Sequence, residues 1–282
     1  MKFQESVFNI IRKRSSCRKY QNVPIKKQTL RILEHAIKKP LKGLFNTEIK
    51  YKLVKLPDEI PDSNKLTYRM VRGAKMFLVG VIPQATPETV IDYGYTFEQV
   101  ILKATELDLG TCWLGQTFRN DYLAKVIELK NDEIIPAISP VGYPTNTTGI
   151  RDSIISLAIR SKRRKSWKHF FFQKDFFHTL SREAAGKFSE TLEMVRWAPS
   201  SRNSQLWRII KDEKMFHFYI ETTEKITPTK FPKLKLLDIG IALCHFDLCV
   251  QEQNIKGSWQ KIAEKENEKS HLKRYIISWI EK

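Results

Sequence analysis

Two short segments, far apart in the chain, carry side chains suited to holding an anionic ligand. The first places Arg14, Ser16 and Arg18 at alternate positions, just after an expected short N-terminal helix. In an extended segment alternate side chains point the same way, so two guanidinium groups and a hydroxyl would form an anion clamp. The donor fork of arginine matches two phosphate oxygens. Basic residues also favour helix C-termini through the helix dipole, so the local pattern leaves a structural role equally open.

The second segment is the loop that follows a helix ending before Pro199, with the sequence APSSRNSQLW at 198–207. Ser200, Ser201 and Asn203 are turn-forming residues whose side chains keep donors and acceptors free. Such a loop can grip the edge of a heteroaromatic ring, and it can equally be an ordinary connection from helix to strand. A third segment, GTCWLGQTF at 110–118, has glycines that let its backbone approach something flat, or that form a tight turn.

A spaced pattern occurs twice, about 146 residues apart. Asp92-Tyr93-Gly94 is followed by 18 residues and then Trp113, and Asp238-Ile239-Gly240 is followed by 18 residues and then Trp259. A Leu-Glu pair that is followed by five residues and then a proline also recurs, at 33–40 and 192–199. Two matches in the same order indicate one ancestral unit used twice. The basic segment RSSCRKY at 14–20 occurs only in the first half, and the serine-rich loop only in the second.

Composition and net charge indicate a folded protein that attracts anionic ligands. The chain has 282 residues, 41% of them hydrophobic, which is enough for a real core, and its formal net charge of +18 would attract anions such as nucleotides or nucleic acid. The densest basic cluster, RSKRRKSWKH at 160–169, is followed by three phenylalanines that could stack on bases. No helix-turn-helix, zinc-finger or RNA-binding signature surrounds it, which favours a charged linker between the halves.

Cysteines and apolar runs point to a cytoplasmic protein without a metal site. The four cysteines form no C-x-x-C, and none has a histidine at metal-ligand spacing, so we expect reduced thiols. The pair Cys244-His245, inside an apolar run, is typical of core packing. The N-terminus is too interrupted for a signal peptide, and no apolar stretch is long enough to cross a bilayer.

Hydrophobic periodicity predicts alternating helices and strands, which places the chain in the mixed α/β classes. Helices 87–107 and 234–253 are apolar over most of their surface, so we expect them to be buried against each other between the halves. Two prolines in the strand 134–142 predict an irregular or edge position. The other expected helices are 26–38, 121–129, 190–197 and 271–280, and the other expected strands are 49–53, 76–82, 111–114, 206–211, 215–221 and one around 258–259.

Together these motifs resemble the nitroreductase family of FMN-dependent oxidoreductases, and within it the branch whose two half-subunits are fused in one chain. The motifs occur in the family's order: RSSCR, DYG with LGTCWLG, PVGYP, the basic linker with WKHFFF, APSSRNSQLW, and DIGIALCHFDL with GSW. The resemblance implies an α+β fold, a nitroreductase-like α/β sandwich of two related halves with central helices packed between them. The first half would span residues 1–160, the crossover linker 161–180 and the second half 181–282.

The resemblance also implies a flavin site shared by the two halves. Because each half carries only one of the two motifs, we expect one FMN per chain. The chain departs from the family's usual Gln-Pro-Trp by having Leu206 in the middle, which removes stiffness from the loop. The implied contacts are Arg14, Ser15 and Ser16 with phosphate and ribityl oxygens, Arg18 with the pyrimidine edge, Leu114, Gly115 and Gln116 with the central ring, Lys162 and Arg164 with the phosphate, and Pro199, Ser200, Ser201 and Asn203 over the ring from the other half.

In activity the resemblance implies an NAD(P)H-dependent oxidoreductase that reduces a nitroaromatic, quinone or enone acceptor by a ping-pong mechanism. No side chain need act as nucleophile or base. Arg18, with Arg69 or Arg72 as helpers, would stabilise the negative charge of the reduced flavin. Two other functions stay open: a flavin-binding sensor or carrier without turnover, and a basic nucleic-acid-binding protein. We expect no membrane partner, and a pseudo-dimer within one chain that is compatible with a monomer.

Overall fold

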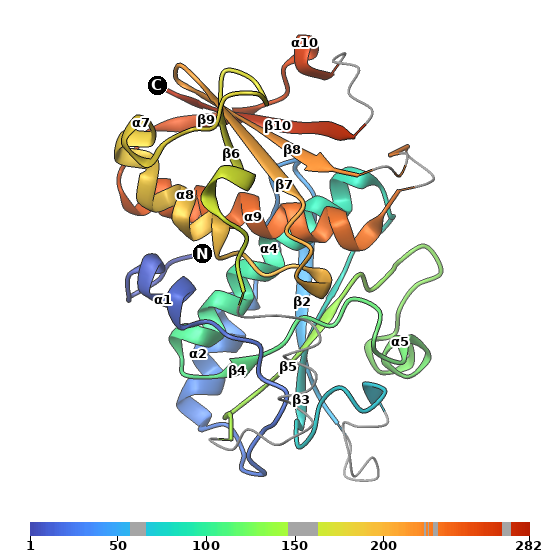
Figure 1. The fold of residues 1–282 in the computed structure, drawn as a ribbon. Helices are drawn as coiled ribbons and strands as arrows, with labels where there is room; N and C mark the ends of the chain where they lie inside the picture. Colours follow the sequence, from blue (N-terminus) through green and yellow to red (C-terminus); the bar gives the residue numbers. More distant parts are fainter. Residues whose placement is uncertain (57–65, 146–162, 223, 225, 228–230, 267–271) are drawn as a thin grey trace.

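Two five-stranded sheets lie on either side of a pair of long helices in the computed structural model (Figure 1). The structure describes residues 1–56, 66–145, 163–222, 224, 226–227, 231–266 and 272–282. The first half contains α1 (Val7–Lys13), α2 (Lys27–Ile37), β1 (Leu41–Lys42), β2 (Glu48–Lys55), β3 (Met76–Val81), α4 (Pro87–Glu106), β4 (Gly110–Thr111), α5 (Asn120–Ile127) and β5 (Ile138–Gly142).

The second half has a similar series of elements. Its first elements, η1 (Trp167–His169) and β6 (Phe171–Gln173), lie within the expected linker, although β6 belongs to the second sheet. The others are α7 (Arg182–Ala185), η2 (Gly186–Phe188), α8 (Ser189–Arg196), η3 (Ser201–Asn203), β7 (Trp207–Asp212), β8 (Met215–Glu221), α9 (Lys233–Glu252), β9 (Gly257–Gln260), α10 (Ala263–Glu266) and β10 (Lys273–Glu281).

The two sheets have the same strand order. The first runs β1-β2-β3-β5-β4 and the second β6-β7-β8-β10-β9. Neighbouring strands are antiparallel, except that β6 is parallel to β7. In each half a short edge strand (β1 or β6) and two antiparallel strands precede a 20-residue helix. The strand at the far edge of the sheet follows, and then the strand that pairs with it. This common order supports the expected relationship between the halves.

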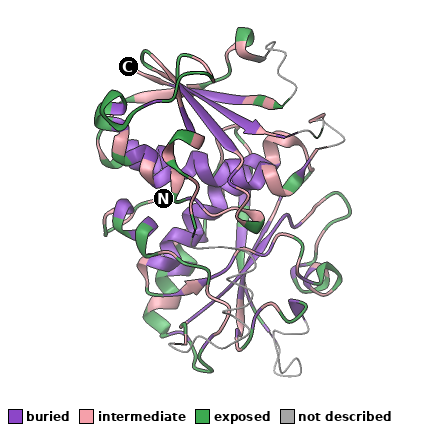
Figure 2. Ribbon diagram, viewed as in Figure 1, coloured by how far each residue is buried: buried purple, intermediate pink, exposed green. Residues whose placement is uncertain are grey.

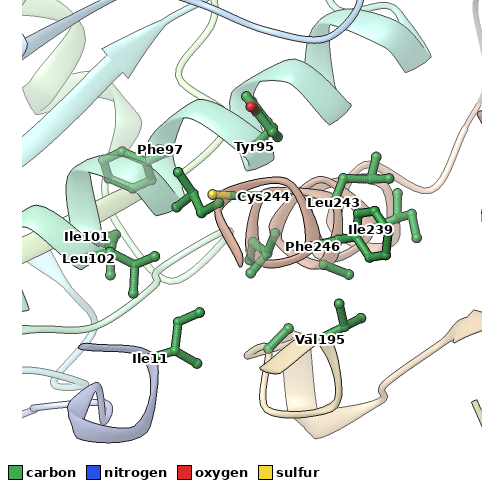
Figure 3. Packing of buried hydrophobic residues seen from close by; sticks show 14 of the residues in the cluster. Ile11, Tyr95, Phe97, Ile101, Leu102, Val195, Ile239, Leu243, Cys244 and Phe246 are labelled. Carbon is green, nitrogen blue, oxygen red and sulfur yellow. The ribbon is translucent and has the colours of Figure 1, made fainter. Parts of the chain in front are cut away.

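Helices α4 and α9 pack directly against each other, as their apolar sequences predict. Both are buried along nearly their whole length (Figure 2). A capping box between Thr86 and Thr89, with Pro87 at the first helical position, fixes the start of α4. Figure 3 shows apolar side chains of both helices gathered at this contact, with Ile11 of α1 and Val195 of α8 beside them.

Two glycines set the distance between the central helices. A Cβ added to Gly94 of α4 would lie 2.3 Å from the carbonyl oxygen of Leu237, and one added to Gly240 of α9 would lie 2.2 Å from that of Ile91. Each glycine therefore meets the carbonyl that lies three residues before the other glycine. The recurring Asp-x-Gly pattern is thus explained in part: its glycines are where the two backbones touch.

The last element differs from its prediction. The segment 271–280 was expected to be helical, but within it the residues from Lys273 on belong to β10, which pairs with β8 and β9. Four consecutive residues, from Ile276 to Trp279, are buried. A short buried run of this kind has too few residues for its period to distinguish a strand from a helix. The β-branched and aromatic residues in this segment favour the strand.

The strand predicted over 134–142 is shorter and lies elsewhere in the sheet. Residues 138–142 form β5 between β3 and β4, so the expected edge position is wrong, whereas the irregularity is present as an isolated bridge at Ile134. Pro140 is tolerated in this inner strand because β4 pairs only with Val141 and Gly142, and so makes no ladder pair with the proline. The strand expected over 111–114 is reduced to β4 and a single bridge at Leu114.

We predict that Gly240→Ala destabilises the protein by about 1–3 kcal/mol, because the added methyl group must push α4 and α9 apart. In an uncrowded helix the same substitution would stabilise by roughly 0.5–1 kcal/mol. The sign of the change in unfolding free energy, measured by urea denaturation, therefore tests the contact. A stabilised variant would show that the helices do not approach this closely.

Candidate active site

A cavity of about 450 Å³ opens beside the N-terminal part of α9, and both halves contribute to its wall. The first half supplies the N-terminal basic segment and the residues after β4, and the second half supplies the loop after α8 and one face of α9. Its lining consists of Arg14, Ser16, Arg18, Met70, Cys112, Trp113, Leu114, Gly115, Gln116, Thr117, Arg164, Pro199, Ser200, Ser201, Arg202, Asn203, Leu234, Leu237, Asp238 and Ile241.

The basic segment is extended, so its side chains alternate between two faces. Ser16 forms a parallel bridge with Thr111, and the Cys17 amide donates a 2.7 Å hydrogen bond to the Thr111 carbonyl. Arg14, Ser16 and Arg18 consequently face the cavity. The intervening residues Lys13, Ser15 and Cys17 line a separate depression of about 190 Å³. Ser15 therefore lies on the opposite face from its expected partners.

Four arginines line the cavity: Arg14, Arg18, Arg164 and Arg202. Burial, together with the positive charges of Arg14 and Arg196, lowers the pKa of Arg164 to about 10. Arg164 is held by hydrogen bonds to the Asn203 side chain (3.3 Å) and to the Trp197 carbonyl (2.9 Å). The Nε of Arg18 is buried and has no hydrogen-bond partner among the residues that the structure describes. An anion beside Arg14 and Arg164 would offset their repulsion, and an acceptor beside Arg18 would satisfy its Nε.

The loop after α8 is held in an unusual backbone conformation. Arg202, Asn203 and Gln205 have φ values of 49°, 56° and 51°, a left-handed region that costs free energy for residues other than glycine. Side-chain hydrogen bonds offset this cost. The Asn203 side chain donates to the Arg163 carbonyl (2.7 Å), and the Gln205 side chain accepts from the Lys165 amide (3.0 Å). The basic linker therefore shapes this loop.

Asp238 anchors the same loop to α9. Its carboxyl group accepts hydrogen bonds from the Ser201 amide (2.8 Å) and the Ser204 hydroxyl (3.3 Å). Burial raises the pKa of Asp238 to about 8, against the opposing effect of these two hydrogen bonds. Asp92, at the corresponding place in α4, accepts from two backbone amides, those of Phe45 and Thr47, each at 2.9 Å. In both halves the aspartate of the Asp-x-Gly pattern therefore holds a loop.

The remaining wall is apolar and comes from both halves. Trp113 and Leu114 follow β4, while Leu237 and Ile241 project from α9. A Cβ on Gly115 would lie 2.4 Å from a terminal methyl group of Leu234, so the two halves approach closely here and a larger residue would require the leucine side chain to shift. The cavity thus combines cationic side chains with an apolar wall, which suits an apolar ligand that carries an anionic group.

The sequence located most of the lining. Every expected contact residue lines the cavity except Ser15, which faces the other way, and Lys162, which lies outside the described residues. Arg69 and Arg72 are not among the lining residues, although Met70 is. Sequence reasoning missed the roles of Asp238 and Trp113, even though the recurring pattern contains both. Cys112 and Thr117 lie in the segment 110–118 and Arg202 in the loop 198–207, both of which the sequence singled out. Nothing in the local sequence marks the other lining residues, Met70, Leu234, Leu237 and Ile241.

The family follows from comparison with known proteins. Residues 6–250 match the model of the family described as "Putative TM nitroreductase". The chain belongs to the nitroreductase family. A protein of Thermotoga maritima described as a putative nitroreductase has a similar fold, with a TM-score of 0.62 and 18% identity over 99% of this chain and 95% of that one. No curated protein sequence matches the chain.

Other solved nitroreductases match about half of this nitroreductase. A nitroreductase with bound FMN from Desulfitobacterium hafniense covers 52% of this chain and 93% of its own, at 21% identity and a TM-score of 0.41. A nitroreductase family protein from Clostridium novyi covers 50% of this chain and 87% of its own, at 19% identity and a TM-score of 0.43. Within the described residues, no helix has the length and apolar character needed to cross a membrane.

We predict that Asp238→Asn alters the pH dependence of stability. A pKa raised from its ordinary value near 3.8 to about 8 means that the folded state favours the protonated carboxyl group, so this contribution to stability is complete below pH ~4 and lost as the pH rises through about 8. Asparagine does not titrate, and it can keep both contacts: its amide oxygen accepts from the Ser201 amide, and its amide nitrogen donates to the Ser204 hydroxyl. The free energy of unfolding of the flavin-free protein can be measured by urea denaturation from pH 5 to 9. Its slope against pH should be less negative in the variant, by up to about 1.4 kcal/mol per pH unit. Parallel pH profiles would contradict the buried neutral carboxyl group.

Proposed function

We propose that this nitroreductase binds one FMN in the cavity between its halves and uses it to pass electrons from NAD(P)H to a small organic acceptor of the nitroaromatic, quinone or enone type. The observation that carries the proposal is the joining, in one cavity, of the mutually repelling Arg14 and Arg164, and of Arg18, with an apolar wall from both halves. The same cavity contains residues of both motifs that sequence reasoning assigned to a shared flavin site.

The residues present fit such a ligand. An FMN phosphate would offset the repulsion between Arg14 and Arg164, which contributes to the lowered pKa of Arg164. Ser16, beside Arg14, would add a hydroxyl donor to the phosphate or ribityl oxygens. The buried Nε of Arg18, which has no hydrogen-bond partner among the described residues, would gain an acceptor on the pyrimidine edge of the ring. Leu114 and Gly115 would lie against the ring.

The chain's own contribution would be placement and charge. When bound, FMN supplies the redox chemistry, accepting a hydride and releasing electrons to the acceptor. Arg18 would hold a fixed positive charge where negative charge develops during reduction. The loop at Ser200, Ser201 and Asn203 would cover one part of the cavity and leave the other open. In this scheme NAD(P)H and the acceptor occupy the open part in turn, which gives ping-pong kinetics.

We infer that the chain is a fusion of two related halves, 1–160 and 181–282, joined by the linker 161–180. An offset of 146 residues relates the two helix-contacting glycines, the two loop-anchoring aspartates and the two tryptophans. The same offset relates Gly115 to Lys261 and Glu88 to Leu234. Gly115 and Leu234 meet beside the cavity, whereas Lys261 and Glu88 stand at the related positions on the other side of the molecule.

That lysine fills the related position on the other side. Its ammonium group lies 3.3 Å from Glu88 and 5.4 Å from the centre of the Phe45 ring. Phe45 belongs to the loop that Asp92 holds, which is the counterpart of the loop that Asp238 holds. A charged pair and an aromatic ring would therefore occupy the place that a second flavin would need. This supports one FMN per chain.

Purification tests the function directly. We predict a yellow protein whose FMN content, from visible absorbance against amino-acid analysis, is one per polypeptide. Anaerobic NADH or NADPH should bleach the flavin, and one of a panel of nitroaromatic, quinone and enone acceptors should restore its colour. A colourless protein that flavin does not bind would refute the site. Flavin that is bound but reacts with neither pyridine nucleotide nor any acceptor would identify a sensor or carrier instead.

The arginine assignments have a matched control in the neighbouring residue. Arg14→Ala combined with Arg18→Ala should weaken FMN binding by 100-fold or more, on the order of two lost charge-assisted hydrogen bonds, without changing the far-ultraviolet circular dichroism. Lys13→Ala removes a charge from the same segment on the face that points away from the cavity, and should leave FMN affinity nearly unchanged. Equal weakening in both variants, measured by fluorescence titration, would show that net charge and not position matters.

A further inference from the structure

A buried chain of hydrogen bonds runs from the cavity wall across the contact between the central helices. The indole Nε1 of Trp113, a cavity residue, donates to Oε2 of Glu98 in α4 at 2.7 Å. Oε1 of Glu98 lies 3.1 Å from Nε2 of His245 in α9, and Nδ1 of that histidine lies 2.8 Å from the Met194 carbonyl in α8. Glu98 and His245 are both 0% exposed.

The donors and acceptors along this chain fix its protons. A backbone carbonyl only accepts, so Nδ1 of His245 carries a hydrogen that it donates to Met194. An indole N–H only donates, so Oε2 of Glu98 accepts. The remaining contact, between Oε1 and Nε2, therefore contains one proton, on either partner. Every polar atom of this hydrogen-bonded network is then satisfied, and the network as a whole carries no net charge, as its burial requires.

The chain links the two parts of the proposed flavin site. At one end Trp113 also packs edge-on against Phe97, with ring centres 4.8 Å apart, so the hydrogen bond and the ring contact together fix the orientation of the indole. At the other end Met194 belongs to α8, the helix that leads into the loop at 199–203. A substitution at Glu98 would therefore affect two parts of the cavity: the wall that the first half supplies at Trp113, and the loop 199–203 that the second half supplies.

A second chain of the same kind lies away from the cavity. Trp259 donates its indole N–H to Asp247 of α9 (2.7 Å), and the hydroxyl of Tyr95 in α4 donates to the other oxygen of that carboxylate (2.6 Å). In both chains a central helix offers a carboxyl group to a tryptophan of its own half and to a side chain of the opposite helix. Neither Trp259 nor Asp247 lines the cavity.

We propose that Glu98 and His245 are positioning residues of the active site, which fix the indole of Trp113 in the wall of the flavin cavity and tie that wall to the loop-bearing half. The proposal rests on the proposed flavin site. Neither residue contacts the cavity, and both act through Trp113 and α8.

Two substitutions at Glu98 separate hydrogen bonding from bulk. In Glu98→Gln the amide oxygen accepts from Trp113, and the amide nitrogen donates to neutral His245, so the whole chain is preserved. In Glu98→Leu both hydrogen bonds are lost. We expect Glu98→Leu to weaken FMN binding by about tenfold, on the order of one buried hydrogen bond, and to change the visible circular dichroism of the bound flavin. Glu98→Gln should resemble the unsubstituted protein in both measurements.

Asp247→Leu is the matched control, because it breaks the equivalent chain on the side away from the cavity. We expect it to lower the midpoint of thermal unfolding much as Glu98→Leu does, while FMN affinity and the visible circular dichroism stay as in the unsubstituted protein. An Asp247→Leu variant that weakens FMN binding as much as Glu98→Leu would reduce Glu98 to a general stabiliser of the helix contact. Unchanged flavin binding in Glu98→Leu would also overturn the proposal.

Hydrogen exchange of the Trp113 indole N–H, followed by nuclear magnetic resonance in flavin-free protein, needs no substitution that could prevent folding. Slow exchange is expected in the unsubstituted protein and in Glu98→Gln. Exchange as fast as that of an exposed indole would show that Glu98 does not hold the ring. If the unsubstituted protein binds no FMN, the proposed function fails, and the exchange rate still decides whether the network fixes Trp113.

Discussion

The approach of α4 and α9 at two glycines is the constraint on which the rest of the structure depends. Because Gly94 and Gly240 lack side chains, each helix places its backbone against a carbonyl of the other. The carboxyl groups on these helices then come within hydrogen-bonding distance of side chains on the opposite one, as Glu98 does with His245. The two halves are therefore joined by an apolar contact that also carries buried hydrogen bonds.

The cavity is a consequence of that contact. Its walls are the ends of the elements that the helices hold in place: the segment after β4, which leads away from α4, and the loop that Asp238 binds to α9. The N-terminal basic segment completes it by pairing with Thr111 of β4. Arginines from both sides of the chain meet in this lining, Arg14 and Arg18 from the first half and Arg164 and Arg202 from the linker and the second.

The sequence predicted what depends on local pattern and on repetition. The central helices follow from their apolar composition, and the alternation of Arg14, Ser16 and Arg18 follows from an extended backbone. The direction of Ser15 follows from the same alternation, and could have been read from it. Resemblance to a family brought Ser15 into the expected site, and the geometry of the segment places it on the other face.

Other features depend on contacts that no local pattern reveals. The final strand was taken for a helix because its buried run has no clear period, and only pairing with β8 and β9 decides between the two. The chemical environment of Asp238 comes from burial beneath a loop some 37 residues earlier in the chain. The recurring pattern marked this aspartate as important, but its function became clear only when the partner loop was seen in space.

The opposite walls of this cavity come from separate parts of one polypeptide, so each wall can be substituted without changing the other. Identical subunits do not allow this. Between two copies of one chain, each substitution appears at every symmetry-related position, so a change that improves one site also alters its twin. Here Gly115 and Lys261 already differ at related positions, one beside the cavity and one in a salt bridge. The surfaces on the two sides can therefore diverge independently, one for binding a ligand and the other for stability.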